Sequence, residues 1–245
     1  MNVLISNDDG IESKGVIELA KEFSKDNSVL LIAPEGNRSA SAHSLTIEKS
    51  LFLKEIKMTP DFRCYSLSGT PVDCVKFAKL HFVEFEPDLV ISGINLGHNI
   101  GSDILYSGTV SIACEAAFFG HVAFAFSCCS KVDDLNIYAS MAVKIVNFLM
   151  PLSKSGDIWN INFPKGDKFK GVKFTKLGKQ LYTDRYENIG SNEFRLVGEL
   201  INHDDNDSDC DVEWLKKGYV TITPILFNKT DYTKIEEVKE ICVKL

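Results

Sequence analysis

The sequence predicts an α/β protein with a doubly wound, mainly parallel sheet and a β-rich C-terminal extension. Two observations favour this fold class. Over the first two thirds of the chain, short continuous apolar runs alternate with segments of helical spacing, a pattern typical of parallel strands joined by helices. After about residue 165 the pattern changes to alternating strands. We therefore divide the chain into an α/β core at 1–165 and an extension at 166–245 that returns to the core.

The first elements predict a β-α-β unit. Residues 3–5 form a short apolar run of the kind found in strands that are covered on both faces. Residues 12–24 have apolar side chains at helical spacing, and the run SVLLIAP at 28–34 indicates a second buried strand. Because such crossovers are right-handed, the two strands are expected to be parallel. The polar stretch 35–50 has no apolar period and predicts a long loop, which in compact domains is usually functional or disordered.

The next segments predict a strand pair and a capped helix. LFLKEI (51–56) and FRCYSLSG (62–69) are expected to form an exposed antiparallel pair. Thr70 is a suitable N-cap, followed by Pro71 at N1 and Asp73 at N3, and this helix is predicted to run to about Phe82.

The remaining segments continue the alternation of strands and helices. PDLVISGINLG at 87–97 predicts a third buried strand followed by a glycine-rich loop, and Gly120 is the expected stop of a helix over 107–120. Further strands are predicted at 122–127, 158–164, 171–177, 193–200 and 218–225, and further helices at 134–149 and near 211–217.

Composition and charge exclude several classes of protein. The net charge is −7, which argues against binding to DNA or RNA polymers because phosphate backbones require a basic surface. No apolar stretch approaches the ~20 residues of a membrane span, and the N-terminus has no basic leader, so no membrane association is expected. The seven cysteines show no C-x-x-C spacing and are predicted to be reduced thiols of a cytoplasmic protein.

Three polar stretches follow the first three predicted strands and are expected to meet at one edge of the sheet. The first contains adjacent carboxylates, Asp8 and Asp9. Two such charges about 4 Å apart repel each other by roughly 4 kcal/mol at an effective dielectric near 20. A divalent cation removes this conflict, and oxygen ligands favour Mg²⁺, Mn²⁺ or Ca²⁺ over zinc. The alternative is that one of the aspartates caps the following helix.

The other candidates each have an ordinary structural interpretation. Ser39 is one of several hydroxyls that could simply solvate the 35–50 loop, and Asn95 could be a turn former. Ser107, Gly108 and Thr109 open a predicted helix, where backbone N–H groups can bind phosphate, although Ser107 could equally be an N-cap. His98 lies in the third polar stretch and is a candidate proton donor.

Two other classes of site are disfavoured. A dinucleotide-binding site would place G-x-G-x-x-G after the first strand, where this chain has NDDGIESKG, whose acids repel a pyrophosphate. A serine-based triad is also disfavoured because the chain has no G-x-S-x-G nucleophile elbow.

With these residues assembled, the chain resembles the stationary-phase survival protein SurE family of metal-dependent nucleotidases. The similar segments span nearly the whole chain, and the longest motif is SGIN-x-G-x-N-x-G-x-D-x-x-YSGT; the segments are ISNDDG, APEGNRSASAHSLT, SLSGTPVDCVKFA, PDLVISGINLGHNIGSDILYSGTVSIACEA, NINFP and GYVTITPI. The resemblance implies a Rossmann-like core and an extension that helps to build homodimers or homotetramers.

The resemblance also implies the roles of individual residues. It places one divalent metal ion per subunit, Mn²⁺ or Mg²⁺ in preference to Ca²⁺, on Asp8, Asp9, Ser39 and Asn95. It implies that Asp8, Asp9 and Asn95 take part in catalysis, and that substrate is bound by Asn37, Asn99, Ser107, Gly108 and Thr109. The sequence departs from the family pattern near the site: Gly36 stands where Arg is common, Ala40 where Gly is usual, and His43 where Asn is frequent.

The expected activity is hydrolysis of nucleoside 5′- and 3′-monophosphates to nucleoside and phosphate. Water is favoured as the nucleophile, because the contiguous aspartates differ from the D-x-D of phosphatases that form an aspartyl-phosphate; the sequence alone leaves that covalent route open. Two further alternatives stay open: a catalytically silent nucleotide or metal sensor, and a phosphatase that acts mainly on polyphosphate or other esters.

Overall fold

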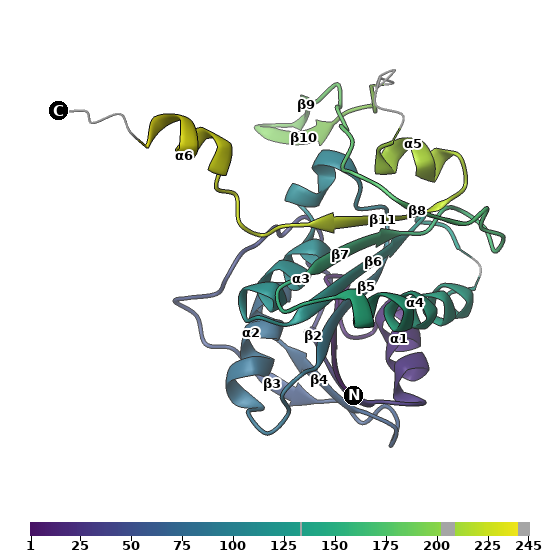
Figure 1. Cartoon of the computed structure of the whole chain (residues 1–245). Helices are drawn as coiled ribbons and strands as arrows, with labels where there is room; N and C mark the ends of the chain where they lie inside the picture. Colours follow the sequence, from purple (N-terminus) through teal and green to yellow (C-terminus); the bar gives the residue numbers. More distant parts are fainter. Residues whose placement is uncertain (133, 202–208, 240–245) are drawn as a thin grey trace.

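A nine-stranded sheet runs through the molecule in the order β3-β4-β2-β1-β5-β6-β7-β11-β8 (Figure 1). The computed structural model describes residues 1–132, 134–201 and 209–239. The strands of the sheet are β1 (Asn2–Ser6), β2 (Ser28–Pro34), β3 (Leu53–Glu55), β4 (Arg63–Leu67), β5 (Leu89–Leu96), β6 (Val122–Cys128), β7 (Ile158–Asn162), β8 (Val172–Phe174) and β11 (Val220–Ile225).

The predicted α/β class is confirmed by this topology. Strands β4, β2, β1, β5, β6 and β7 are parallel, whereas β3 and β11 run antiparallel to their neighbours β4 and β7. The predicted antiparallel pairing of β3 with β4 is confirmed. The prediction that both strands are exposed was wrong for β4. That strand also pairs with β2 inside the sheet, and its residues Cys64, Ser66 and Leu67 are buried.

Helices cover both faces of the sheet. On one face lie α1 (Lys14–Ser24) and α4 (Asn136–Leu149), the latter continued by the 3₁₀ turn η2 (Met150–Leu152), and on the other lie α2 (Pro71–His81) and α3 (Gly108–Phe118) (Figure 1). Alternation along the strands divides the core between the two faces: Val3 and Ile5 pack with α1, and Leu4 packs with α2 and α3. Each such side chain that is fully buried contributes about 1.5–3 kcal/mol.

The helix α2 begins with the predicted cap. The Thr70 hydroxyl accepts a hydrogen bond from the backbone N–H of Asp73 at 3.1 Å, and the Asp73 carboxylate accepts one from the N–H of Thr70 at 2.8 Å. Because both exposed N–H groups are satisfied, this reciprocal capping box fixes the start of α2 at Pro71.

The sheet order places a topological switch point beside β1. The chain passes from β1 to β2 on one side and later returns to β5 on the other side, so the loops after β1 and β5 leave the sheet in opposite directions. A crevice outside the carboxyl ends of the strands is where open α/β sheets bind ligands.

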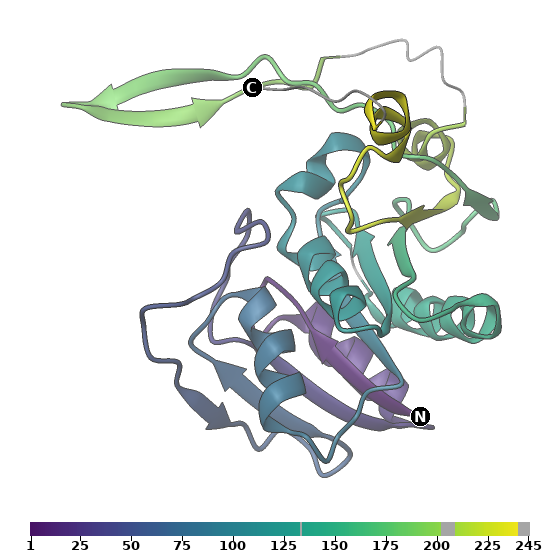
Figure 2. The same ribbon diagram turned by 60° about the vertical axis from the view of Figure 1, so that its left-hand side comes forward.

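The segment after residue 165 both extends the sheet and leaves it. Strands β11 and β8 lengthen the sheet beyond β7, whereas β9 (Arg185–Gly190) and β10 (Glu193–Val197) form a separate hairpin that projects from the body (Figure 2). The helices α5 (Asp211–Lys216) and α6 (Tyr232–Val238) follow. Strand β9 and helix α6 were not predicted; both are short, and neither contains a buried residue.

The described part of the chain contains no helix that is long and apolar enough to cross a membrane. The six cysteines in the described part of the chain form no disulfide, among them the neighbours Cys128 and Cys129, and Cys242 lies outside the described residues. Burial raises the pKa of Cys128 to about 12, with smaller contributions from Cys129 and Asp9, so this thiol is protonated at neutral pH.

The Asp211 carboxylate ties the extension to the core. It is fully buried and accepts hydrogen bonds from the backbone N–H groups of Gly101 at 2.9 Å, Gly178 at 2.7 Å and Val212 at 2.9 Å. Gly101 begins the short 3₁₀ helix η1 (Gly101–Leu105), which follows the loop after β5. One side chain therefore holds the extension against the loop at the switch point.

Removing this carboxylate is expected to destabilise the protein. Asp211→Ala leaves three buried N–H groups without a partner, so we predict a loss of about 3 kcal/mol in the free energy of unfolding, measured by chemical denaturation. Asp26→Ala at an exposed surface position is the control, with a change below about 0.5 kcal/mol. Equal stability of the two variants would contradict the role given to Asp211.

Candidate active site at the switch point

A tight turn presents the two aspartates at the end of β1. The buried Asn7 side chain closes this turn, since its Oδ1 accepts from the N–H of Gly10 at 3.1 Å and its Nδ2 donates to the carbonyl of Gly10 at 3.0 Å. Gly10 has φ +101°, a conformation that favours glycine, and a Cβ here would lie 2.9 Å from the backbone of Gly36. The loops after β1 and β2 are thus in direct contact.

Asp8 faces the first turn of α3. The Thr109 hydroxyl donates to Asp8 Oδ1 at 2.5 Å, and both residues are buried. Burial raises the pKa of Asp8, and the Thr109 hydroxyl and nearby backbone N–H groups, including those of Gly108 and Thr109, partly oppose that rise. The start of α3 is therefore occupied by a protein carboxylate, while the Ser107 hydroxyl caps the helix by accepting from the N–H of Val110 at 3.1 Å.

Asp9 is only partly satisfied. Burial and the charge of Asp8 raise the pKa of Asp9, and the backbone N–H of Leu96 at the end of β5 opposes the rise. Its Oδ2 atom is buried and has no hydrogen-bond partner among the described residues. A buried carboxylate oxygen without a donor is costly unless a ligand completes it.

Asn95 reaches the same edge from β5. The register of β5 against β6 shifts between Ser92 and Asn95, so one extra residue is inserted and the strand bulges. The Asn95 Nδ2 donates to the carbonyl of Gly97 at 2.7 Å. Its Oδ1 is therefore the atom of this side chain that is suited to a cation.

Ser39 and Asn37 lie on the loop that is tied to Asp8. The N–H of Arg38 donates to the Asp8 carbonyl at 2.7 Å, and the N–H of Ser39 donates to Asn37 Oδ1 at 2.8 Å. Both Ser39 and Asn37 are exposed, and the loop contains no helix or strand, as predicted. The structure thus brings this segment to Asp8 through its backbone.

Asn99 is placed inside the fold. It is 7% exposed, its Nδ2 donates to Ser127 Oγ at 2.8 Å, and its carbonyl accepts from the side chains of Asn160 at 2.8 Å and Asn162 at 2.9 Å. The two strand asparagines hold the loop after β5, a role that sequence reasoning missed. Their position in the otherwise apolar strand β7 was the available signal, because buried carboxamides need partners.

His98 is held beside this loop. Its Nε2 lies 3.0 Å from the carbonyl of Phe163, which can only accept, so Nε2 carries a proton. Burial lowers the pKa of His98. A neutral imidazole whose N–H is already donated to the backbone is poorly placed to act as a proton donor.

The donor set at the switch point fits a hard divalent cation. Asp8, Asp9, Asn95 and Ser39 offer carboxylate, amide and hydroxyl oxygens, and the orphaned Oδ2 of Asp9 needs a positive partner. Among the residues that the structure describes there is no group of three or more His, Cys, Asp or Glu that could hold a metal.

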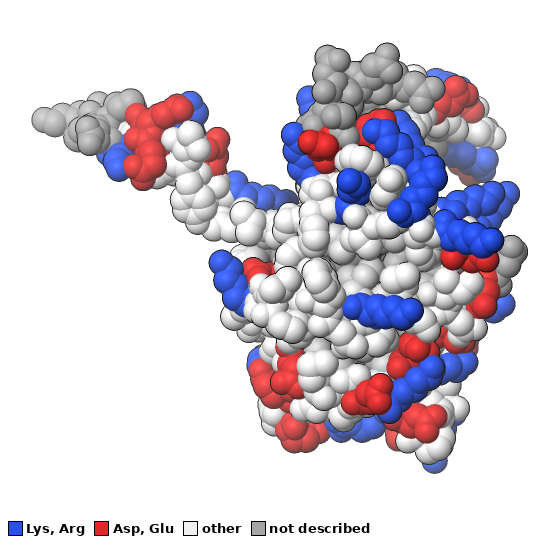
Figure 3. Space-filling model, turned by 45° about the vertical axis from the view of Figure 1, so that its right-hand side comes forward, with Lys and Arg blue, Asp and Glu red and all other residues white. Residues whose placement is uncertain are grey.

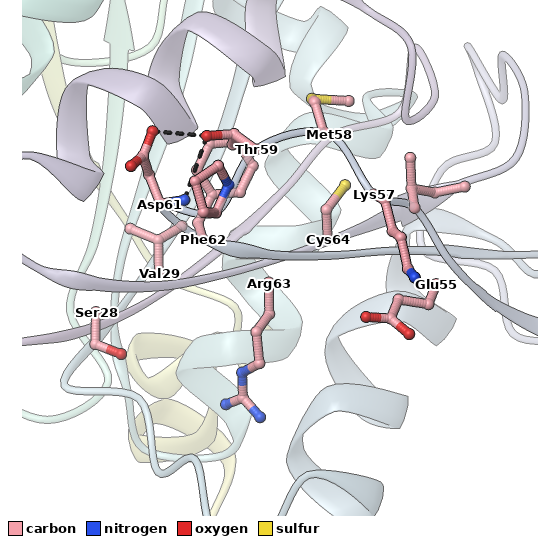
Figure 4. Close-up of a pocket in the computed structure, with 12 residues that line it drawn as sticks. Ser28, Val29, Glu55, Lys57, Met58, Thr59, Asp61, Phe62, Arg63 and Cys64 are labelled. Carbon is pink, nitrogen blue, oxygen red and sulfur yellow. Dashed lines mark hydrogen bonds between the residues drawn. The ribbon is translucent and has the colours of Figure 1, made fainter.

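A cavity of about 620 Å³, shown close up in Figure 4, lies at the end of the sheet opposite the candidate site. It is lined by the beginnings of β2 and β4 and by the segment before β4. Within this segment the Thr59 hydroxyl donates a hydrogen bond to Asp61 Oδ2 at 2.6 Å. In Figure 4 Arg63 and Cys64 point to opposite sides of β4. This cavity opens at the amino ends of the parallel strands, away from the candidate site.

Together, the doubly wound sheet and the oxygen-bearing side chains at its switch point define a Rossmann-like α/β protein with a candidate site that contains two carboxylates. Comparison with known proteins narrows this class. The sequence profile of the survival protein SurE family matches residues 3–184, and the chain belongs to this family.

The relatives cover nearly the whole chain. The 5′-nucleotidase SurE of a strain of Clostridium botulinum is 38% identical over 98% of this chain and 99% of its own, and that of Caldanaerobacter subterraneus is 40% identical over 96% and 95%. The crystal structure of the SurE protein from Aquifex aeolicus superposes with a TM-score of 0.83 at 32% identity, covering 97% of this chain and 98% of that chain.

The close contact between α3 and Asp8 can be tested by adding one methyl group. In Gly108→Ala the new Cβ would lie 2.6 Å from the Cβ of Asp8, so one of the two must move, and we predict a loss of about 1–3 kcal/mol in the free energy of unfolding.

Gly36→Ala is the matched control, since nothing lies within 4 Å of a Cβ at that position. It is expected to leave stability unchanged or to raise it by up to about 1 kcal/mol. Equal stability of the two variants in thermal or chemical unfolding would contradict the tight contact between Gly108 and Asp8.

Proposed function

We propose that this chain is a divalent-metal-dependent phosphomonoesterase that hydrolyses nucleoside 5′-monophosphates, and also 3′-monophosphates, to nucleoside and phosphate. The nucleotidase activity is supported by the family and by relatives that are named 5′-nucleotidases. The observation that supports the metal dependence is the buried Asp9 Oδ2, which lies near a second carboxylate and has no hydrogen-bond partner in the described part of the chain. A protein that only had to fold would gain nothing from this arrangement.

Asp8, Asp9, Asn95 and Ser39 would hold the cation. When bound, a divalent ion supplies positive charge that polarises a phosphoryl group and lowers the pKa of water. The chain's own residues position these groups: Thr109 fixes the rotamer of Asp8 through its 2.5 Å hydrogen bond, and Leu96 orients Asp9. We also propose that Asn37 and the Ser107–Thr109 turn contact the substrate. Asn99 would act by holding the loop after β5.

Water attack is favoured over an aspartyl-phosphate. The Asp8 carboxylate accepts from the Thr109 hydroxyl and is stabilised by backbone N–H groups at the start of α3, so it is engaged on the side that faces the helix. A nucleophilic carboxylate needs an accessible oxygen aligned with the phosphorus. Asp9, whose Oδ2 accepts no hydrogen bond from the described residues, is the better placed of the two to orient or deprotonate a water molecule.

Neutralising Asp8 should separate activity from folding. Asp8→Asn keeps the shape of the side chain but removes the charge, so we expect phosphate release from AMP to fall by about 100-fold or more. Because burial disfavours the ionised carboxyl, stability should stay within about 1 kcal/mol of the parent. Turnover near that of the parent would remove Asp8 from the mechanism; Asp26→Asn at an exposed site is the control.

Removal of metal is the second test. We expect the chelator-treated protein to release no phosphate from 5′-AMP or 3′-AMP, and Mn²⁺ or Mg²⁺ to restore release from both. Mn²⁺ should also stabilise the parent by about 2.7 kcal/mol at 100 times the Kd, which is measured as a higher unfolding temperature. It should not stabilise Asp8→Asn. Phosphate release that survives chelation would contradict the proposal, and nucleotide binding without release would favour a silent sensor. A panel including polyphosphate would identify a different main substrate.

We also propose that the chain works as a homodimer or homotetramer. The hairpin β9–β10 exposes Tyr186, Phe194 and Leu196, which are 71%, 57% and 56% exposed, and it projects from the body (Figure 2). A two-stranded hairpin alone is marginally stable in water, so apolar side chains on such an arm favour a partner surface. Sedimentation of the parent and of Phe194→Asp tests this: a monomeric parent would contradict it, and dissociation of the variant is expected.

A further inference from the structure

A second cavity, of about 500 Å³, lies between the 35–50 loop, α3 and the segment after β11. Its walls are largely apolar, and they include Leu45, Ile104, Leu105, Phe118 and Phe227. The rings of Phe118 and Phe227 meet edge to face, with centroids 6.2 Å apart. Ligand cavities of this size are typically apolar with a few polar groups at defined positions.

Both walls of this cavity continue from the walls of the candidate active site. The 35–50 loop contacts Asp8 through the backbone of Arg38 and contributes Leu45 to the cavity, while α3 places Thr109 against Asp8 and Ser111 at the cavity. The N–H of Ala42 donates to the carbonyl of Tyr106 at 3.2 Å, which joins the two walls. Ser111 lies three residues after Gly108, about 4.5 Å along the helix axis, so the cavity begins about one helical turn from Asp8.

The polar groups of the cavity are centred on Glu115. This carboxylate is buried, and its two oxygens lie 2.9 Å from His43 Nε2 and 2.8 Å from Lys76 Nζ. Burial raises the pKa of Glu115, but the hydrogen bonds from His43 and Lys76 outweigh it, so the net pKa is below its usual value and the group is charged. The cavity thus combines apolar and aromatic walls with one fixed set of donors and acceptors.

We propose that this cavity holds the base of the nucleotide, with Phe118 as a wall of the base site. The inference rests on the proposed nucleotidase function and adds to it the place of the leaving nucleoside. Because the cavity begins about one helical turn from Asp8 along α3, a nucleotide with its phosphate at the switch point can direct its base toward the cavity. Apolar and aromatic walls suit the faces of a base. A polyphosphate chain is less well matched, because two of the basic residues that line the cavity, His43 and Lys76, are already paired with the Glu115 carboxylate.

The test compares two phenylalanines with the same exposure. Phe118 is the last residue of α3 and is 62% exposed, and Phe148 lies near the end of α4 and is 61% exposed, outside the cavity. For Phe118→Ala we expect the KM for AMP and GMP to rise about tenfold with little change in kcat. Phe148→Ala should behave as the parent. Ribose 5-phosphate, which has no base, should give the same kinetic constants with all three proteins.

A second pair of variants makes the same comparison at Leu105, which lines the cavity from the end of η1. Leu105→Ala removes a side chain that is 56% exposed in the cavity, and Leu152→Ala removes one that is 67% exposed elsewhere. Both leucines are exposed, so neither substitution should prevent folding. We expect a higher nucleotide KM for Leu105→Ala only.

The outcomes separate the cavity from the activity. An unchanged nucleotide KM in both cavity variants overturns the inference while leaving the nucleotidase function intact. The same holds if these variants raise the KM for ribose 5-phosphate as much as the KM for nucleotides. A change in oligomeric state without a change in KM would show that a second copy of the chain covers the cavity, and this also overturns it. If no protein releases phosphate with any metal, the proposed function fails, and the base site is then judged by equilibrium binding of AMP to the parent and Phe118→Ala.

Discussion

The contact between Asp8 and the first turn of α3 is the constraint on which the site depends. Two adjacent carboxylates are withdrawn from water at the end of β1, and burial raises the pKa of both. The Thr109 hydroxyl and the N–H groups at the helix start stabilise one of them, and this requires that residue 108 carry no side chain. The Asn7 turn and the bulge in β5 serve the same geometry, because they bring Asp9 and Asn95 to the same crevice.

The layered core makes this geometry rigid. Strands β1, β2 and β5 alternate their side chains between two helix layers, so a shift of one residue in register would move every core side chain to the wrong face. The loops that follow these strands therefore leave the sheet at fixed points. The extension adds to this rigidity through Asp211, which holds the start of η1 from the far side of the loop after β5.

Figure 3 shows acidic and basic side chains on the same face of the molecule, and no single basic surface covers the described part of it in that view.

Much of the fold and part of the site could be predicted from sequence, for physical reasons that differ by residue. Buried strands such as β2 and the capping box at Thr70 are local signals, so their predicted limits agree closely with the structure. The meeting of the three polar stretches followed from the rule for parallel sheets. The environment of Asn99 could not be predicted, because its partners Asn160 and Asn162 are more than 60 residues away. The antiparallel direction of β11 depends in the same way on long-range pairing.

Charge balance at the crevice gives an independent reason to expect a cation. A helix N-terminus can bind a phosphate, but here groups in the first turn of α3 also stabilise the carboxylate of Asp8, so a phosphate bound by this turn would lie beside a negative charge. No Lys or Arg among the described residues lowers the pKa of Asp8 or Asp9. A phosphate monoester brought beside these two acids would add negative charge next to carboxylates whose ionised forms no described Lys or Arg stabilises. We infer that a nucleotide enters this site only together with a divalent ion, so metal and substrate should bind with positive coupling.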